Sequence, residues 1–245
     1  MDYIIIGAST GLGKKLAYQF AKNKKNLILS SRDLDELNLI KYDIEKKFQI
    51  KVQTIQADFS KIENVKKKFN LKKNFFKNVE GILFPIGQMD DLDQINTNSK
   101  TINSLMLSNF ISVSYLATKF IKEKKEGIVV GFGSVSGALG RKINPYYSAS
   151  KRGLESFFES LILSNKNKKI LIHFYILGYL DTNLSFGKKL FLKKGSTQLL
   201  SKEVYRNRLK SSGKYYFPYW WNIIVFILKL LPFNFLIFFF NFLNR

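Results

Sequence analysis

Short apolar runs alternate with longer amphipathic stretches along most of the chain, and this alternation limits its possible folds more than any other feature. Several runs, including Ile4-Ile5-Ile6 and Ile128-Val129-Val130, are apolar at every position. Such runs are typical of strands buried on both faces, as in a parallel sheet between two layers of helices. The sequence therefore predicts an α/β fold with one doubly wound parallel sheet and helices on both faces. The expected strands are 2–7, 26–31, 51–57, 81–86, 127–132 and 169–177, and the expected helices are 11–23, 33–48, 61–70, 99–122, 145–164 and 200–210.

Length and composition exclude several classes of protein. The 245 residues suit one α/β domain with a full core, and 46% of them are hydrophobic, which argues against a disordered or fibrous chain. The absence of cysteine excludes a disulfide scaffold, a thiolate zinc site and a cysteine nucleophile. The single histidine, His173, excludes a site built from several histidines, so we expect no bound metal and interpret His173 as a packed strand residue.

The segment from residue 7 to residue 13 joins the first expected strand to the first expected helix and reads Gly-Ala-Ser-Thr-Gly-Leu-Gly. Glycines permit a tight turn and let a phosphate approach the backbone, and the N-terminus of the following helix adds free N–H groups and partial positive charge. At a strand-to-helix junction, this pattern predicts a dinucleotide site rather than a plain turn. The residues assigned to the site are Gly7, Ser9, Thr10, Gly11, Leu12 and Gly13.

The end of the second expected strand indicates which dinucleotide is preferred. An acidic residue in this region would bind the ribose diol of NAD, but this chain has Ser31 and Arg32. A guanidinium beside a hydroxyl suits a 2′-phosphate, which favours NADP(H) and leaves NAD(H) as the alternative. A competing interpretation pairs Arg32 with Asp33 or Asp35. At the end of the third strand, Asp58-Phe59 is assigned to the same site, with Asp58 meeting an adenine edge or capping the next helix.

Tyr147 and Lys151 are four residues apart in an expected helix, so their side chains lie on one face, one turn apart. A nearby ammonium favours the phenolate and lowers the pKa of a tyrosine from about 10, which permits proton exchange with an alcohol oxygen near neutral pH. Ser134, thirteen residues before Tyr147, follows the fifth expected strand. Its hydroxyl is expected at the carboxyl edge of the sheet, where it can hold a carbonyl oxygen.

Together, the glycine loop, the spacing of Ser134 and Tyr147 and the Tyr-x-x-x-Lys motif resemble the short-chain dehydrogenase/reductase family. The resemblance runs from about residue 2 to about residue 216, and we assign 1–216 to a Rossmann-type catalytic domain. It implies that Tyr147 is the general acid, that Lys151 lowers its pKa and binds the nicotinamide ribose, and that Ser134 orients the carbonyl.

The resemblance also implies roles for residues outside this motif. Asn109 matches the helix asparagine that holds a proton-relay water, and Gly87 belongs to the segment beside the adenine ribose. Gly178 and Thr182 match the segment that contacts the nicotinamide. Plainer alternatives stay open for two of these residues, since Asn109 also suits a helix-packing amide and Thr182 a helix cap.

The chain departs from the family pattern without losing a reacting group. Ile6 replaces a usual threonine before the first glycine, and Phe84-Pro85-Ile86 replaces the usual Asn-Asn-Ala before the retained glycine. Leu177 stands where the family has a proline, which leaves the path of the chain past the nicotinamide open.

The tail, 217–245, is strongly apolar and follows a short expected strand at 214–217. Because Lys229 and Pro232 interrupt it, we expect two short segments, about 219–231 and 233–243, that lie in a membrane surface rather than span it. The formal net charge of +22 would favour anionic lipid. In the alternative, the tail covers the substrate or forms a subunit interface.

These features predict an NADP-dependent oxidoreductase that interconverts a carbonyl and an alcohol on a hydrophobic or lipid-linked substrate, in the cytoplasm at the inner face of the membrane. The tail alone also resembles that of reductases of polyprenyl-phosphoryl sugars. The alternatives are a soluble reductase of a small ketone or sugar and a nucleotide-binding protein without catalysis. The basic residues are scattered and no nucleic-acid motif accompanies them, so we expect no nucleic-acid partner. The family resemblance implies a homo-oligomer.

Overall fold

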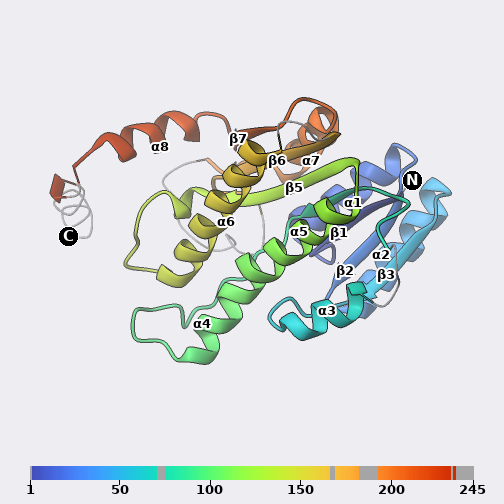
Figure 1. Ribbon diagram of the computed structural model, residues 1–245, viewed down its shortest axis with the longest axis horizontal. Helices are drawn as coiled ribbons and strands as arrows, with labels where there is room; N and C mark the ends of the chain where they lie inside the picture. Colours follow the sequence, from blue (N-terminus) through green and yellow to red (C-terminus); the bar gives the residue numbers. More distant parts are fainter. Residues whose placement is uncertain (1, 71–74, 166–168, 182–192, 233, 236–245) are drawn as a thin grey trace.

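The computed structural model describes residues 2–70, 75–165, 169–181, 193–232 and 234–235. At its centre is one seven-stranded sheet in the order β3-β2-β1-β4-β5-β6-β7, in which every neighbouring pair of strands is parallel (Figure 1). The strands are β1 (Asp2–Ile6), β2 (Asn26–Ser31), β3 (Val52–Gln56), β4 (Val79–Phe84), β5 (Glu126–Ser134), β6 (Lys169–Leu177) and β7 (Gly213–Phe217). The helices are α1 (Gly11–Lys22), α2 (Leu34–Phe48), α3 (Ile62–Asn70), α4 (Ser99–Met106), α5 (Ser112–Glu123), α6 (Pro145–Ser164), α7 (Thr197–Asn207) and α8 (Trp221–Leu230).

Both faces of the sheet are buried, as the continuous apolar runs predict. In β1, Tyr3 and Ile5 pack into the core that α1, α2 and α7 cover. Ile4 and Ile6 of the same strand pack into the core beneath α3, α5 and α6. All four side chains are fully buried. The predicted α/β fold with a doubly wound parallel sheet is confirmed.

Several elements differ from their expected bounds for local reasons. β4 ends at Phe84 because Pro85 has no N–H to continue the ladder. The expected helix 99–122 contains a π-helical turn, η1 (Leu107–Ile111), between α4 and α5. α7 begins earlier than expected because Ser196 caps it, accepting a hydrogen bond from the Leu199 N–H.

The order of the strands reverses at β1, which lies between β2 and β4. In open α/β sheets, ligands bind outside the carboxyl ends of the strands at such a point. The glycine loop follows β1, and the segment after β4 lies against it, since a Cβ built on Gly7 would lie 2.9 Å from the Cα of Ile86. The fold therefore places the predicted dinucleotide loop beside the segment that carries Gly87.

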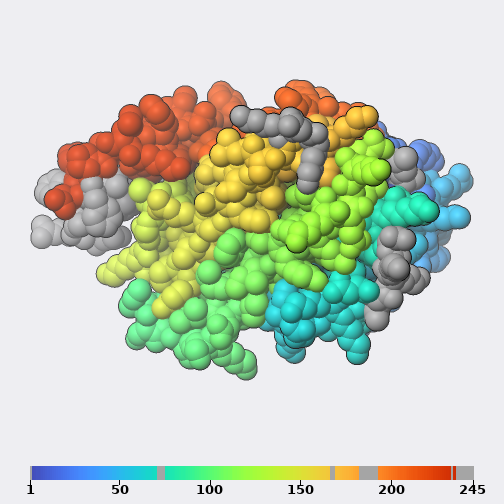
Figure 2. Space-filling model, in the orientation of Figure 1, coloured from blue at the N-terminus to red at the C-terminus, as the bar shows by residue number. Residues whose placement is uncertain are grey.

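α8 packs against the body of the protein through one of its faces. Trp221 and Val225 form a small buried cluster with Ala138, which lies between β5 and α6. One turn further along, Lys229 Nζ lies 3.9 Å from the carboxylate of Glu155 on α6. Figures 1 and 2 show α8 in red at one end of the molecule, beside the segment that joins β5 to α6.

The structure describes the whole of the first expected tail segment and only residues 234–235 of the second. The expected strand 214–217 is β7, and the segment 219–231 contains α8. Most of the segment 233–243 lies outside the described residues. Within the part of the chain that is described, no helix combines the length and the apolar character that crossing a bilayer requires.

Candidate active site

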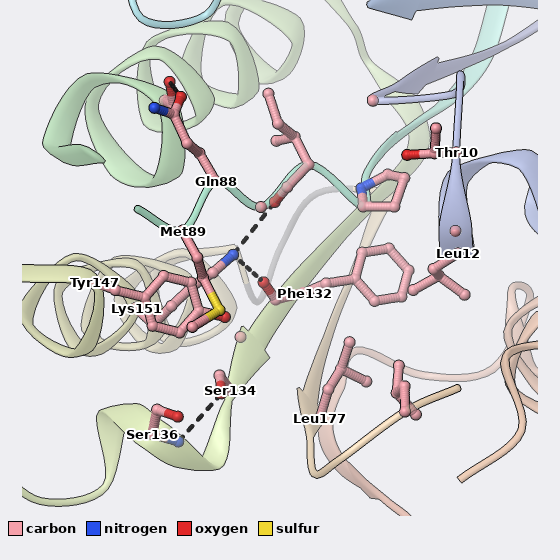
Figure 3. Close-up of a pocket in the computed structure, with 18 of the residues that line it drawn as sticks. Thr10, Leu12, Gln88, Met89, Phe132, Ser134, Ser136, Tyr147, Lys151 and Leu177 are labelled. Carbon is pink, nitrogen blue, oxygen red and sulfur yellow. Dashed lines mark hydrogen bonds between the residues drawn. The ribbon is translucent and has the colours of Figure 1, made fainter. Parts of the chain in front are cut away.

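A cavity of about 850 Å³ opens at the carboxyl edge of the sheet, and most of the predicted site residues line it (Figure 3). The predicted residues on its wall are Gly7, Ser9, Thr10, Gly11, Leu12, Ser31, Arg32, Asp58, Phe59, Gly87, Ser134, Tyr147, Lys151 and Gly178. Gly13 and Asn109 do not reach the wall, and Thr182 lies outside the described residues.

The glycine loop has the backbone conformation that the pattern predicts. Gly7 has a φ of 84° and Gly11 a φ of 51°, values that L side chains rarely adopt. A Cβ on Gly13 would lie 1.9 Å from the carbonyl oxygen of Gly7, so Gly13 lets α1 approach the end of β1. Thr10, the N-cap residue of α1, makes no side-chain cap hydrogen bond. The N-terminus of α1 can therefore receive an anion from the cavity.

Arg32 lines the cavity beside Ser31, at the end of β2. Of the described carboxylates, none lies within ion-pair distance of Arg32, so the alternative pairing with Asp33 or Asp35 is not observed. Asp33 instead caps α2 by accepting a hydrogen bond from the Glu36 N–H at 2.9 Å. The guanidinium of Arg32 is thus available to a ligand.

Asp58 lies on the cavity wall, next to the buried Phe59. Its carboxylate accepts hydrogen bonds from the backbone N–H of Ser60 at 3.0 Å and from the Ser60 hydroxyl at 2.7 Å. Burial favours the neutral acid, but these hydrogen bonds and the charge of Arg32 hold the pKa of Asp58 below its ordinary value. Asp58 therefore presents a carboxylate at the cavity and stabilises the turn before α3.

Tyr147 and Lys151 face the same cavity from α6, as their spacing predicts (Figure 3). The exposed fraction of the Tyr147 side chain is 8% and that of Lys151 is 3%. Lys151 Nζ lies 5.9 Å from the centre of the Tyr147 ring. It donates hydrogen bonds to the carbonyl oxygens of Ile86 at 3.2 Å and Phe132 at 3.1 Å. Lys151 thus ties α6 to the ends of β4 and β5.

The pKa of Tyr147 differs from the sequence-based prediction. Burial raises this pKa, and the Ser134 hydroxyl and the charge of Arg141 only partly oppose the effect. The predicted net lowering is therefore not observed in this structure, where the Lys151 ammonium donates its hydrogen bonds to two carbonyl groups. The contribution of Lys151 to the Tyr147 pKa stays a prediction. Burial lowers the pKa of Lys151 to about 8.

Ser134 ends β5, and its Oγ accepts a hydrogen bond from the Ser136 N–H at 3.1 Å. This bond caps the short 3₁₀-helix η2 (Val135–Gly137) and holds the Ser134 hydroxyl at the cavity wall. The Ser136 hydroxyl in turn accepts a hydrogen bond from Arg141 Nη1 at 2.8 Å. A line of polar groups therefore runs from Ser134 to the guanidinium of Arg141.

Asn109 is fully buried in the π-helical turn, and its amide bonds to the backbone of Gln88. Asn109 Nδ2 donates to the Gln88 carbonyl at 2.9 Å, and Asn109 Oδ1 accepts from the Gln88 N–H at 2.7 Å. Asn109 thus positions the segment after β4, which agrees with the packing-amide alternative. Its predicted role in holding a water stays a prediction.

Gly178 follows β6 on the cavity wall and lies against the tail. A Cβ on Gly178 would lie 1.8 Å from Trp221 Nε1, so only glycine admits the indole here. The Gly178 N–H donates to the Phe217 carbonyl at 2.9 Å, and the ring of Tyr179 lies 5.6 Å from that of Trp221. α8 therefore contacts the wall of the cavity directly.

The sequence matches the model of the short chain dehydrogenase family over residues 3–190. The chain belongs to this family. The membership confirms the predicted family and an oxidoreductase that acts on CH–OH and C=O groups.

Similar proteins agree with this assignment. Hydroxysteroid 11-beta-dehydrogenase 1-like protein B of Xenopus laevis is 26% identical over 233 residues, which cover 89% of this chain and 77% of the relative. The very-long-chain 3-oxoacyl-CoA reductase of Rattus norvegicus is 28% identical over 210 residues, which cover 82% of this chain and 66% of the relative. A short-chain dehydrogenase from Sphingobium yanoikuyae, solved with NADPH, has a TM-score of 0.77 at 19% identity, covering 89% of this chain and 87% of the other.

Four residues of this short-chain dehydrogenase matter to the site although the sequence analysis gave them no role in it. Gln88 and Arg141 line the cavity, Trp221 packs on Gly178, and the buried Asp93 binds the backbone of Tyr147. No local pattern reveals the contacts of Asp93 or Trp221, since their partners are distant in sequence. The sequence does hold a signal for the other two, since Gln88 follows the predicted Gly87 and Arg141 lies between the predicted Ser134 and Tyr147.

Proposed function

We propose that this short-chain dehydrogenase transfers a hydride between NADP(H) and a carbonyl–alcohol pair on a hydrophobic or lipid-linked substrate. One observation carries the proposal: Ser134, Tyr147 and Lys151 open into the same cavity as the glycine loop and Arg32. The same cavity therefore contains a proton donor, a hydroxyl that can bind a carbonyl oxygen, and a binding site for a phosphorylated dinucleotide.

The residues at the glycine-loop end of the cavity fit NADP(H). The loop brings backbone N–H groups and the N-terminus of α1 to the cavity, where a pyrophosphate would bind. Arg32, which has no ion pair with a described carboxylate, suits a 2′-phosphate better than a ribose diol. Bound there, the dinucleotide would supply or accept the hydride. The NADPH in the similar Sphingobium yanoikuyae structure supports this preference.

The side chains at the other end of the cavity suit carbonyl reduction. The Ser134 hydroxyl holds the carbonyl oxygen, and the Tyr147 hydroxyl gives that oxygen a proton as the hydride adds to the carbonyl carbon, which yields the alcohol. A raised pKa keeps Tyr147 protonated, as a general acid requires. The buried cation of Lys151 stabilises the tyrosinate that remains, and the alcohol oxidation runs the same steps in reverse.

A large apolar substrate is favoured by the cavity wall and by the relatives. Beyond Tyr147 the wall includes Met89, Ile143 and Tyr179. Ile143 is 67% exposed, so apolar surface continues from the cavity to the outside. The names of the relatives refer to a hydroxysteroid and to a very-long-chain 3-oxoacyl-CoA, which supports an apolar ketone here.

We also propose that α8 binds the surface of an anionic membrane. Trp221, Val225 and Lys229 face the body of the protein, whereas the opposite face of α8 is apolar and exposed. The exposed apolar residues of this face are Ile223, Phe226, Ile227 and Leu230. The net charge of +22 complements anionic lipid and makes a membrane a better occupant of this face than another copy of so basic a chain.

A cofactor titration followed by a ketone panel tests the proposed reaction. We expect NADPH to bind more tightly than NADH, and Arg32→Glu to weaken NADPH binding by roughly tenfold or more while sparing NADH. Lys51→Glu is the control, because Lys51 is exposed, lies away from the cavity and undergoes the same change of charge. Tyr147→Phe should retain NADPH binding and lose turnover. Undiminished turnover of ketones by Tyr147→Phe would exclude the assigned proton donor.

Vesicle flotation tests the membrane proposal. We expect the protein to float with phosphatidylglycerol vesicles and less with phosphatidylcholine vesicles. A Phe226→Ser/Ile227→Ser variant should lose this binding, whereas Leu199→Ser should keep it, since Leu199 is a similarly exposed apolar residue on α7. The alternative outcome is that the protein binds neither kind of vesicle and forms a homo-oligomer that the double variant cannot form. The exposed face of α8 would then be a subunit interface.

A further inference from the structure

Arg141 lies at the end of the cavity where the carbonyl is reduced. It belongs to the segment between η2 and α6 and lines the cavity together with Ser136 and Tyr147. Its Nη1 donates a hydrogen bond to the Ser136 hydroxyl at 2.8 Å. This bond anchors one edge of the guanidinium beside the catalytic hydroxyls. The remaining N–H groups of the planar fork are free to bind a ligand.

The electrostatics around Arg141 favour a negatively charged ligand. The cavity wall carries two carboxylates, Asp33 and Asp58, which follow the ends of β2 and β3 on the dinucleotide side. Beside Tyr147 the charged residues on the wall are Arg141 and Lys151, both cations. Within the described chain, Arg141 forms no ion pair with a carboxylate. An uncompensated guanidinium in a cavity attracts an anion.

The position of Arg141 suits the substrate rather than the dinucleotide. Arg32 and the glycine loop occupy the opposite end, where the phosphates of the dinucleotide would bind. Arg141 lies close enough to Tyr147 for its charge to favour the phenolate, although burial outweighs this effect. Apolar residues, Met89, Ile143 and Tyr179, share this end of the wall. A ligand that satisfies both features combines an apolar part with an anionic group close to its carbonyl.

We propose that Arg141 binds an anionic group of the substrate, a carboxylate or a phosphate ester, and so selects acidic ketones over neutral ones. This inference rests on the proposed carbonyl reduction and adds the chemical class of the substrate to it. Arg141 is then a specificity-determining residue, while Ser134 and Tyr147 act on the carbonyl.

Two matched pairs of ketones test the selection and separate the two anionic groups. The pairs are levulinate with methyl levulinate, and acetol phosphate with acetol. We expect the wild-type protein to prefer the anionic member of at least one pair in kcat/KM. Arg141→Gln should reduce that preference by roughly tenfold to a hundredfold, because a charge-assisted hydrogen bond is lost. Arg141→Lys should restore part of it.

Lys142→Gln is the matched control, since Lys142 is the neighbouring cation, is exposed as Arg141 is, and does not line the cavity. It should leave the preference at the wild-type value. Equal kcat/KM for the acidic and neutral members of both pairs in the wild-type protein would overturn the role of Arg141 and leave the proposed reaction intact. An equal loss of preference in Lys142→Gln would also overturn it, since a general surface charge would then explain the effect.

A binding measurement keeps the inference independent of turnover. Levulinate and NADP⁺ are both oxidised and do not react, so calorimetry can measure the binding of levulinate or acetol phosphate to the NADP⁺-loaded protein. We expect Arg141→Gln to weaken the binding of the favoured anion by the same factor as in kinetics. Arg141-dependent binding without reduction of any ketone would support the anion site and count against the proposed reaction. Binding of both anions that does not depend on Arg141 would refute the site.

Discussion

The carboxylate of Asp93 accepts hydrogen bonds from the backbone N–H groups of Tyr147, at 2.8 Å, and of Tyr146, at 3.0 Å. Both N–H groups belong to the first turn of α6, where helices leave backbone donors unpaired. The N-cap residue of α6, Asn144, has a φ of 59° and makes no side-chain cap hydrogen bond. Asp93, which is 1% exposed, therefore replaces the missing cap and fixes the turn that presents the proposed proton donor.

Asp93→Ala should lower both stability and turnover. Two N–H groups, that of Tyr147 buried and that of Tyr146 partly buried, lose their acceptor, which costs about 2 kcal/mol of the free energy of unfolding, and Tyr147 loses its fixed position. Asp93→Asn keeps an oxygen acceptor, so its stability and turnover should lie between those of the wild type and those of Asp93→Ala. Asp91→Ala is the control, because Asp91 is exposed two residues away. Denaturant unfolding and kcat check the expectation, and an Asp93→Ala protein as stable as Asp91→Ala would contradict it.

NADPH affinity should fall as pH rises through about 8. Burial lowers the pKa of Lys151 to about 8, so the side chain is a cation below that pH and neutral above it. The ammonium form of Lys151 is the better hydrogen-bond donor to the nicotinamide ribose, and a ligand that binds only this form loses about tenfold in affinity for each pH unit above the pKa. Tyr147 stays protonated over this range because its pKa is raised. Fluorescence titration checks the profile, and Lys151→Gln should flatten it. If the NADPH affinity of Lys151→Gln still falls above about pH 8, a group other than Lys151 causes the pH dependence.

The parts of the fold set by local patterns could be predicted from the sequence. The apolar runs predicted the strands, and the glycines at 7, 11 and 13 predicted a loop whose positive φ values and close packing require glycine. The spacing of Tyr147 and Lys151 placed both side chains on one cavity. Each of these inferences depends on residues close together in the chain, or on strand ends that a parallel sheet must bring to one edge.

The parts that depend on distant contacts could not be predicted. Asp93 is 54 positions from Tyr147, and no periodicity links a loop acid to a helix that far away. The direction of the Tyr147 pKa shift was also out of reach, because it depends on how deeply the phenol is buried and on where the Lys151 ammonium points. The contact of Trp221 with Gly178 joins the tail to the cavity in a way that hydropathy alone does not show.

Trp221→Ala should release α8 from the body of the protein. The indole is 7% exposed and fills the space above Gly178, so its removal leaves Val225 as the remaining buried residue of that helix. Gly178→Ala should act in the same way, since its Cβ would meet Trp221 Nε1 at 1.8 Å. Tyr219→Ala is the control, because Tyr219 is 80% exposed. We expect faster amide hydrogen exchange over residues 221–230 in the first two variants. Unchanged exchange in Trp221→Ala would show that other contacts hold α8 in place.

Acid should destabilise the protein partly through His173. The side chain is 1% exposed in β6 and stacks on Tyr215 of β7 with a ring separation of 5.8 Å. Burial lowers the pKa of His173 from 6.5 to about 4, with only partial opposition from the backbone of Arg208. The unfolded chain therefore binds a proton below pH 6.5 that the folded chain does not bind until about pH 4. Stability should fall between these values, by roughly 3 kcal/mol in total for this group.

His173→Phe isolates this contribution, because phenylalanine keeps the stacked ring and cannot take up the proton. Urea unfolding of both proteins from about pH 7 to about pH 4 gives the difference in the free energy of unfolding at each pH. Carboxylates that titrate near pH 4 affect both proteins equally and cancel in that difference. We expect the variant to gain stability relative to the wild type as pH falls below 6.5. A difference that stays constant over the whole range would mean that His173 takes up its proton equally in the folded and unfolded states.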